Sequence, residues 1–168
     1  AAGTARAKLW LDGLRKPNLK QSVPQIGAPA AWAAGFDGTG VTVAVVDTGI
    51  DTTHPDLAGR VTAQQDFTED GSPLDRVGHG THVAATIGST GAAPGGYRGV
   101  ASGASLVSAK VCVDYGCEES WILAGMQWAA EQGAKVINMS LTGPDTPEQD
   151  PLEAAIAQLT DEFGALFV

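Results

Sequence analysis

An aspartate and a histidine stand out as residues that could move a proton. Asp47 directly follows the apolar run VTVAVV, and His79 lies between two glycines in DRVGHGTHVAATIG. A buried carboxylate is costly unless something pairs with it, so an acid at the end of such a run is rarely filler. An imidazole that donates to this carboxylate would be held in one tautomer and stabilised when protonated. The pair predicts an orienting acid and a general base. The structural alternatives are a turn or N-cap acid for Asp47 and a packed or surface role for His79.

A second histidine, His82, follows His79 at a spacing that places both on neighbouring faces of a helix. A metal pair would need a third ligand close by, as in HExxH, and the candidates His54 and Asp56 lie far away in the sequence. We therefore interpret His82 as a structural residue that faces the helix-packing layer, and we disfavour a metal centre.

Strands and helices alternate from residue 41 onward. Apolar strands are predicted at VTVAVV, SLVSAKV, AKVINM and ALFV, and helices at residues 78–89, EESWILAGMQWAAEQG and DPLEAAIAQLTDEFG. This alternation predicts an α/β fold with a doubly wound, mostly parallel sheet and helices on both faces. Sites in such folds form at the carboxyl ends of the strands, where DTGID and SLTGPD lie.

Local signals mark two further helix positions. Asp150 fits an N-cap, Pro151 the first helical position and Glu153 the acid of a capping box. The Ala-rich segment GAPAAWAAG predicts a short helix. Residues 1–25 are expected to be irregular, apart from one short strand in AKLWLDG.

Composition limits the classes of partner. The chain has 168 residues and a formal net charge of −9, with 43% hydrophobic residues. These values fit one globular domain with an N-terminal arm and argue against nucleic-acid and anionic-membrane partners. No apolar run approaches the roughly 18 residues of a membrane span. AAGTARAKLW does not resemble a signal peptide, so for an exported protein we expect that segment to have been removed.

The two cysteines, Cys112 and Cys117, are spaced more widely than in CxxC, and no second pair completes a zinc site. A small disulfide-closed loop is the favoured interpretation, and two unpaired thiols are the alternative. A disulfide fits a secreted, extracellular protein.

Two long motifs resemble those of subtilisin-like serine proteases (subtilases, the peptidase S8 family). VAVVDTGIDTTHPDL resembles the family's aspartate motif, GHGTHVAATIGS its histidine motif, and SVPQIGAPAAW the start of the mature enzyme. The resemblance covers residues 21–168 and implies the N-terminal part of a catalytic domain, with a subtilisin-like fold that is incomplete in this chain. It implies a serine endopeptidase with Asp47 as the triad acid and His79 as the base, acting on peptide or protein substrates without a required cofactor.

The same resemblance implies a substrate cleft. VINMSL is similar to the family's substrate-binding strand, so Ser140 and Leu141 would offer backbone groups to an extended peptide and Thr142 would line the first specificity pocket. The family usually has glycine at the position of Thr142, which implies a narrowed or reshaped pocket. VDYGC, with Tyr115 and Gly116, resembles the opposing edge segment, shortened by one residue.

Asp56 matches a position that binds calcium in many members of the family. The partner loop in those members bears asparagine, whereas this chain has STGAAPGGYRGVASGA. We expect the family's strong calcium site to be lost or altered in this chain. Calcium is retained as a candidate structural ion and not as a required cofactor. A turn acid in HPDL is the alternative for Asp56.

The family's serine motif, GTSMA, and its oxyanion-asparagine motif, AAGN, do not occur in the 168 residues. We expect the nucleophile to lie beyond Val168 and the 168-residue chain alone to be inactive. We also expect the C-terminal remainder of the protease to be a partner of this chain, and one form of this hypothesis makes it a separate chain. Residues 1–20 are expected to be an N-terminal arm or the tail of a pro-segment. The alternative function is a non-catalytic binding module with the subtilase fold. A nucleotide-binding domain is disfavoured, because DTGIDTTHPDL stands where a GxGxxG loop would be needed.

Overall fold

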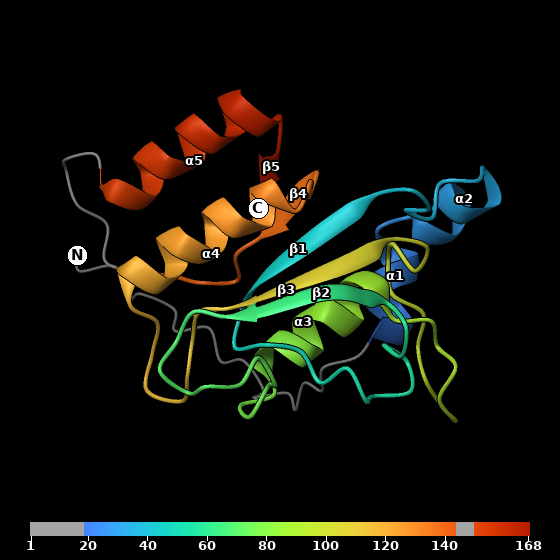
Figure 1. The fold of residues 1–168 in the computed structure, drawn as a ribbon. Helices are drawn as coiled ribbons and strands as arrows, with labels where there is room; N and C mark the ends of the chain where they lie inside the picture. The colour runs from blue at the N-terminus through green and yellow to red at the C-terminus, as the bar shows by residue number, and fades with distance from the viewer. Residues whose placement is uncertain (1–18, 144–149) are drawn as a thin grey trace, which may run out of the picture.

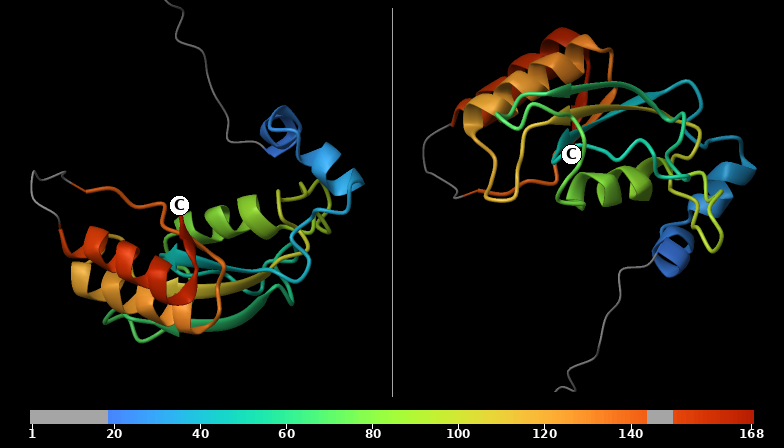
Figure 2. Two further views of the ribbon diagram at one scale, coloured as in Figure 1. Left: turned by 90° about the horizontal axis from the view of Figure 1, so that it is seen from above. Right: turned by 60° about the horizontal axis from the view of Figure 1, so that its bottom comes forward.

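The computed structural model describes residues 19–143 and 150–168, which contain one parallel five-stranded sheet with the strand order β2-β3-β1-β4-β5. Helix α3 covers one face of the sheet, and α4 and α5 cover the other (Figures 1 and 2). The predicted α/β fold with helices on both faces is therefore confirmed. The strands are β1 (Thr42–Asp47), β2 (Val61–Asp66), β3 (Ser105–Lys110), β4 (Val136–Asn138) and β5 (Leu166–Phe167). The helices are α1 (Leu19–Gln25), α2 (Ala28–Ala33), α3 (His79–Gly88), α4 (Glu119–Glu131) and α5 (Pro151–Phe163).

Strand β1 lies at the centre of the sheet and is buried on both faces. Val43 and Val45 belong to the apolar cluster under α3, and Ala44 and Val46 belong to the cluster under α4 and α5. Side chains of a strand alternate between faces, so only a continuous apolar run can serve a strand covered on both sides. This burial explains why β1 was predictable, and it places Asp47 at the carboxyl edge of the sheet.

Two elements differ from the sequence-based expectation. Strand β2 was not predicted, because VTAQQD has no apolar run; it is an edge strand that pairs only with β3 and has alternating burial. Helix α1 forms where irregular chain was expected, with Pro24 inside it and the buried Val23 as its anchor. The strand expected in AKLWLDG lies outside the described residues.

The predicted helix signals near the C-terminal end are present. The side chain of Asp150 accepts a hydrogen bond from the backbone N–H of Glu153 at 2.8 Å, and Pro151 is the first residue of α5. Gly164 ends α5 in the left-handed conformation, at φ 64°. The chain then turns back to pair β5 with β4.

Candidate active site

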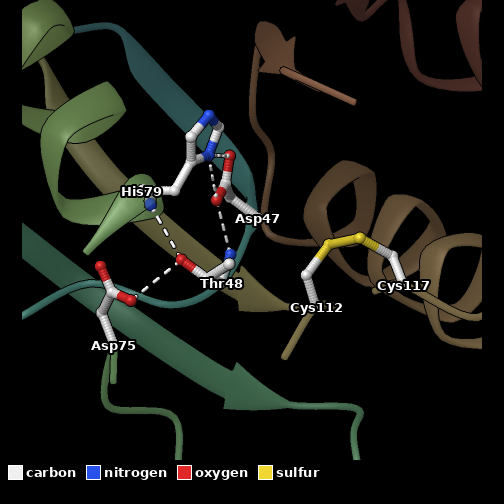
Figure 3. Close-up of a disulfide and its surroundings, with 7 residues drawn as sticks. Asp47, Thr48, Asp75, His79, Cys112 and Cys117 are labelled. Carbon is white, nitrogen blue, oxygen red and sulfur yellow. Dashed lines mark hydrogen bonds and ion pairs between the residues drawn. A yellow bond between two sulfur atoms is a disulfide. The ribbon is translucent and has the colours of Figure 1, made fainter. Parts of the chain in front are cut away.

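Asp47 and His79 contact each other at the carboxyl edge of the sheet (Figure 3). Nδ1 of His79 lies 2.8 Å from Oδ1 and 2.9 Å from Oδ2 of Asp47. The Asp47 side chain is 1% exposed and the imidazole 50% exposed. Because an ionised carboxylate can only accept, the hydrogen of the neutral ring lies on Nδ1, and Nε2 keeps its lone pair. Nε2 points away from Asp47, so the ring can accept a proton from a third group.

The backbone around the pair is fixed by the ends of two elements. Asp47 ends β1 and His79 begins α3. A Cβ on Gly80 would lie 2.2 Å from the carbonyl oxygen of Gly49 and 3.1 Å from Oδ1 of Asp47. Only glycine lets the start of α3 come this close to the loop after β1. The small residue after His79 is therefore a condition for the contact between acid and base.

Strand β3 supports the carboxyl end of β1. The backbone oxygen of Asp47 accepts hydrogen bonds from the N–H groups of Val111 at 2.8 Å and Cys112 at 3.2 Å. The side-chain Oδ1 also accepts from the N–H of Thr48 at 2.7 Å. These bonds hold both the main chain and the carboxylate of Asp47.

A cavity of about 730 Å³ opens between the segment after β3 and the segment after β4. Its lining includes four of the five residues predicted to bind substrate, namely Gly116, Ser140, Leu141 and Thr142. The fifth, Tyr115, is outside the lining and 76% exposed. Apolar side chains from α4, α5 and the sheet complete the lining, among them Ile122, Met139, Leu152, Ile156 and Phe167.

Residues 38–168 match the Subtilase family. The chain belongs to the subtilase family. It is 43% identical over 138 residues to the "Major intracellular serine protease" of Bacillus subtilis (strain 168), covering 77% of this chain and 43% of that protein. It is 46% identical over 129 residues to "Subtilisin E" of the same organism, covering 74% and 34%. It is 41% identical over 128 residues to "Thermitase" of Thermoactinomyces vulgaris, covering 74% and 45%.

The subtilase resemblance inferred from the motifs is thus confirmed, and this chain spans less than half the length of these curated relatives. Two relatives, from Bacillus subtilis and Paenibacillus polymyxa, are named as intracellular serine proteases. Their names do not favour the secreted location expected from the cysteines. None of the helices in the described part of this subtilase is long and apolar enough to cross a bilayer.

The two cysteines of this subtilase form the expected disulfide, Cys112–Cys117. Cys112 follows the end of β3 and is buried, whereas Cys117 is exposed and lines the cavity. Inside the loop, the backbone of Val113 and that of Gly116 exchange hydrogen bonds of 2.9 and 3.2 Å. The disulfide therefore closes a short loop that forms one wall of the cavity.

Asp75 and Thr48, which were not predicted from the sequence, connect the segments that carry the acid and the base. Asp75 accepts hydrogen bonds from Thr48, Gly78 and Thr81. Burial raises the pKa of Asp75, but the hydrogen bonds from Thr81, Gly78 and Thr48 outweigh burial and hold the pKa below its ordinary value. The available signal was an acid four residues before His79 in a turn-forming stretch.

The structure contradicts the expected orientation of His82. Its side chain is exposed and does not face the helix-packing layer. The buried positions of α3 are Gly80, Ala84 and Gly88. At about 100° per residue, position 82 lies roughly 200° around the helix from position 80 and so on the opposite face. The small residues, rather than the histidine, pack against the sheet.

Asp56 is buried and bonded to the loop after α3. Its Oδ1 accepts from the backbone N–H of Ala93 at 2.6 Å, and its backbone oxygen accepts from Thr90 at 3.0 Å. Among residues 19–143 and 150–168, no group of three or more histidine, cysteine or acidic side chains could hold a metal ion. Calcium at Asp56 stays a prediction, and the observed bonds give this acid a role in holding the loop.

Proposed function

We propose that this chain supplies the acid and the base of a serine endopeptidase whose nucleophilic serine lies C-terminal to Val168. The observation that carries the proposal is the bond between the buried carboxylate of Asp47 and the half-exposed imidazole of His79. Asp47 orients the ring. Nε2 of His79 takes the proton of the serine hydroxyl during attack on the peptide carbonyl and later gives it to the leaving amine.

The cavity supports a peptide or protein substrate bound in an extended form. Its walls come from the segment that contains Gly116 and from residues 139–143. Backbone groups of Ser140 and Leu141 on one side, and of Tyr115 and Gly116 on the other, would pair with the substrate main chain. Thr142 in the lining would reduce the space for the side chain that precedes the cleaved bond. Most of the lining is apolar and favours an apolar substrate side chain, although Glu119 adds one charged residue to it.

Ser140 is not the nucleophile in this proposal. Its hydroxyl donates to Oδ1 of Asn138 at 3.1 Å, and the residue lies in the cavity wall. The serine and the oxyanion asparagine would come from the C-terminal remainder of the protease. We also propose residues 21–168 as the N-terminal part of the catalytic domain and residues 1–20 as an arm or pro-segment tail. Helix α1 runs across that boundary.

We propose export for the whole protein, supported by the disulfide, because disulfides persist in oxidising compartments. The relatives named as intracellular weigh against it. Cell fractionation followed by mass spectrometry of the free and disulfide-bonded cysteines would decide between the two locations. Reduced Cys112 in a cytosolic protein would contradict export.

The test of the protease proposal uses the full-length protein that contains this chain. A serine-directed fluorophosphonate should label one serine beyond Val168. Asp47→Asn should lower kcat/KM by about 10⁴-fold, the loss usual for the orienting acid of such triads, while the protein stays folded. Asp161→Asn, an exposed acid on α5 outside both the pair and the cavity lining, is the matched control and should keep its activity. A folded protein that neither reacts with the probe nor cleaves peptides would be the non-catalytic binding module instead.

A further inference from the structure

The carboxylate of Asp75 collects hydrogen-bond donors from both sides of His79. Oδ1 accepts from the backbone N–H groups of Val77 at 3.0 Å and Gly78 at 2.8 Å. Oδ2 accepts from the backbone N–H of Thr81 at 2.9 Å and from its hydroxyl at 2.6 Å. Gly78, at the N-cap position of α3, has no side chain to satisfy these amides. Asp75 therefore caps α3 from outside the helix and fixes the backbone that carries His79.

The hydroxyl of Thr48 connects this cap to the acid. It donates to Oδ1 of Asp75 at 2.9 Å and accepts from the backbone N–H of Gly80 at 2.9 Å (Figure 3). The backbone N–H of the same threonine donates to Oδ1 of Asp47 at 2.7 Å. Thr48 is 6% exposed, so water does not compete freely for these bonds. The side chain of Thr48, directly after Asp47, is therefore bonded to the backbone of Gly80, directly after His79.

The two loops that carry these residues are packed without spare room. A Cβ on Gly49 would lie 2.5 Å from the carbonyl oxygen of Pro73 and 3.0 Å from the backbone nitrogen of Asp75. The hydroxyl of Thr81 accepts from the backbone N–H of Asp51 at 2.9 Å. The loop after β1 and the loop before α3 are therefore held to each other at several points.

These contacts bear on proton transfer because the side-chain bonds of the imidazole hold the ring from one side, at Nδ1. It is half exposed, and its ring is bonded to the carboxylate of Asp47 on one side. The position of the ring therefore depends on the backbone on either side of His79. A misplacement of about 1 Å in a catalytic group can lower a rate by roughly 10²-fold.

We propose that Asp75, acting through Thr48 and the first turn of α3, is a positioning residue that sets the alignment of the His79 imidazole between Asp47 and the reacting serine. The inference rests on the proposed protease function. Asp75 touches neither substrate nor the reacting atoms in this scheme. Its role is to keep the base at the distance and angle that proton transfer requires.

The main test is Asp75→Asn in the full-length enzyme. Asparagine keeps the size of the side chain but places an NH₂ group against backbone N–H donors. We expect kcat to fall by roughly 10- to 100-fold while KM stays within about threefold. The downfield proton resonance of His79 Nδ1–H should shift or broaden.

The matched control is Asp66→Asn, because Asp66 accepts the same kinds of bond from Thr68 and Ser72. The control should keep the kcat and the proton resonance of the unmodified enzyme.

A second pair of variants keeps the test decisive if Asp75→Asn does not fold. Thr48→Val removes the hydroxyl bridge, whereas Thr48→Ser retains it. We expect Thr48→Val to lower kcat and Thr48→Ser to preserve it. The proposal is overturned if Asp75→Asn keeps full kcat, if Asp66→Asn loses as much, or if the two Thr48 variants behave alike. Absence of fluorophosphonate labelling in the unmodified protein would instead refute the protease function. The Nδ1–H resonance would then still report whether Asp75 positions the ring.

Discussion

Lys110 stands opposite Asp47 in the parallel register of β3 and β1, yet its ammonium group pairs with Asp70. The Lys110 side chain is 1% exposed, and its Nζ also donates to the carbonyl oxygen of Leu74 at 3.0 Å. Among the residues that the structure describes, the buried acid at the end of β1 therefore has His79 as its ionisable partner. The lysine instead holds the loop between β2 and α3 against the end of β3.

The first prediction concerns the bonds of Lys110 to Asp70 and Leu74. Lys110→Met fills a similar volume but removes the donor to the carbonyl oxygen of Leu74 and one of two cationic partners of Asp70, which keeps its bond from Arg76 at 3.0 Å. We expect the free energy of unfolding to fall by about 2 kcal/mol, the size usual for hydrogen bonds to a charged group. Urea unfolding of the full-length protein measures the change. Asp70→Asn should also destabilise, because it leaves a buried ammonium without its counter-charge. Unchanged unfolding midpoints in both variants would show that the loop is held by other contacts.

The second prediction concerns acid stability. The pKa of Asp75 lies below its ordinary value of 3.8. An acid whose pKa is lower in the folded than in the unfolded protein stabilises the fold above the unfolded pKa. That contribution is lost as the pH falls below 3.8 and through the folded pKa. Asp75→Asn should therefore be less stable than the unmodified protein near pH 7, and the difference should shrink as the pH falls below 3.8 and through the lower folded pKa.

Melting temperatures recorded across that pH range measure the effect. The pKa values of Asp51 and Asp70 are also lowered, by hydrogen bonds from Thr53 and Lys110 respectively. These acids remain in the Asp75 variant, so both proteins should lose stability in acid and only the difference between them reports on Asp75. A difference that stays constant with pH would show that the variant acts through packing rather than through charge.

How well a strand could be predicted from the sequence depended on how far its side chains are buried. Strand β1 was predictable because its apolar run is covered on both faces, and Asp47 was conspicuous because it ends that run. Strand β2 was missed because an edge strand takes its backbone bonds from β3 and needs few apolar side chains.

The candidate site residues also differed in how well the sequence predicted them. The contact between Asp47 and His79 was expected from the motif and from the rule that parallel strands place sites at their carboxyl ends. Asp75 was missed because its importance lies in bonds to backbone N–H groups, which leave no pattern of side chains in the sequence. The orientation of His82 was wrong because small residues set the buried face of α3.

The third prediction concerns the loop of the disulfide. Replacing both Cys112 and Cys117 with serine opens a loop whose ends are five residues apart in sequence. For so short a loop, the chain-entropy estimate of the stability loss is about 2 kcal/mol. Because Cys117 and Gly116 line the cavity, we expect KM for peptide substrates to rise several-fold with a smaller change in kcat. Equal KM values before and after the substitution would remove this loop from the substrate site.

The fourth prediction concerns the approach of α3 to the loop after β1. Gly80→Ala would place a Cβ 2.2 Å from the backbone oxygen of Gly49, which cannot give way as a flexible side chain would. We expect the free energy of unfolding to fall by roughly 1–3 kcal/mol, the range for overpacking, and kcat to fall because Asp47 is the next neighbour.

Gly88→Ala in the same helix is the matched control. Its Cβ would meet the flexible Leu106 side chain at 3.2 Å rather than a backbone atom, so the neighbour can give way. Chemical unfolding and steady-state kinetics of the two variants should therefore differ sharply, and similar losses in both would mean that the start of α3 is not under the constraint the structure indicates.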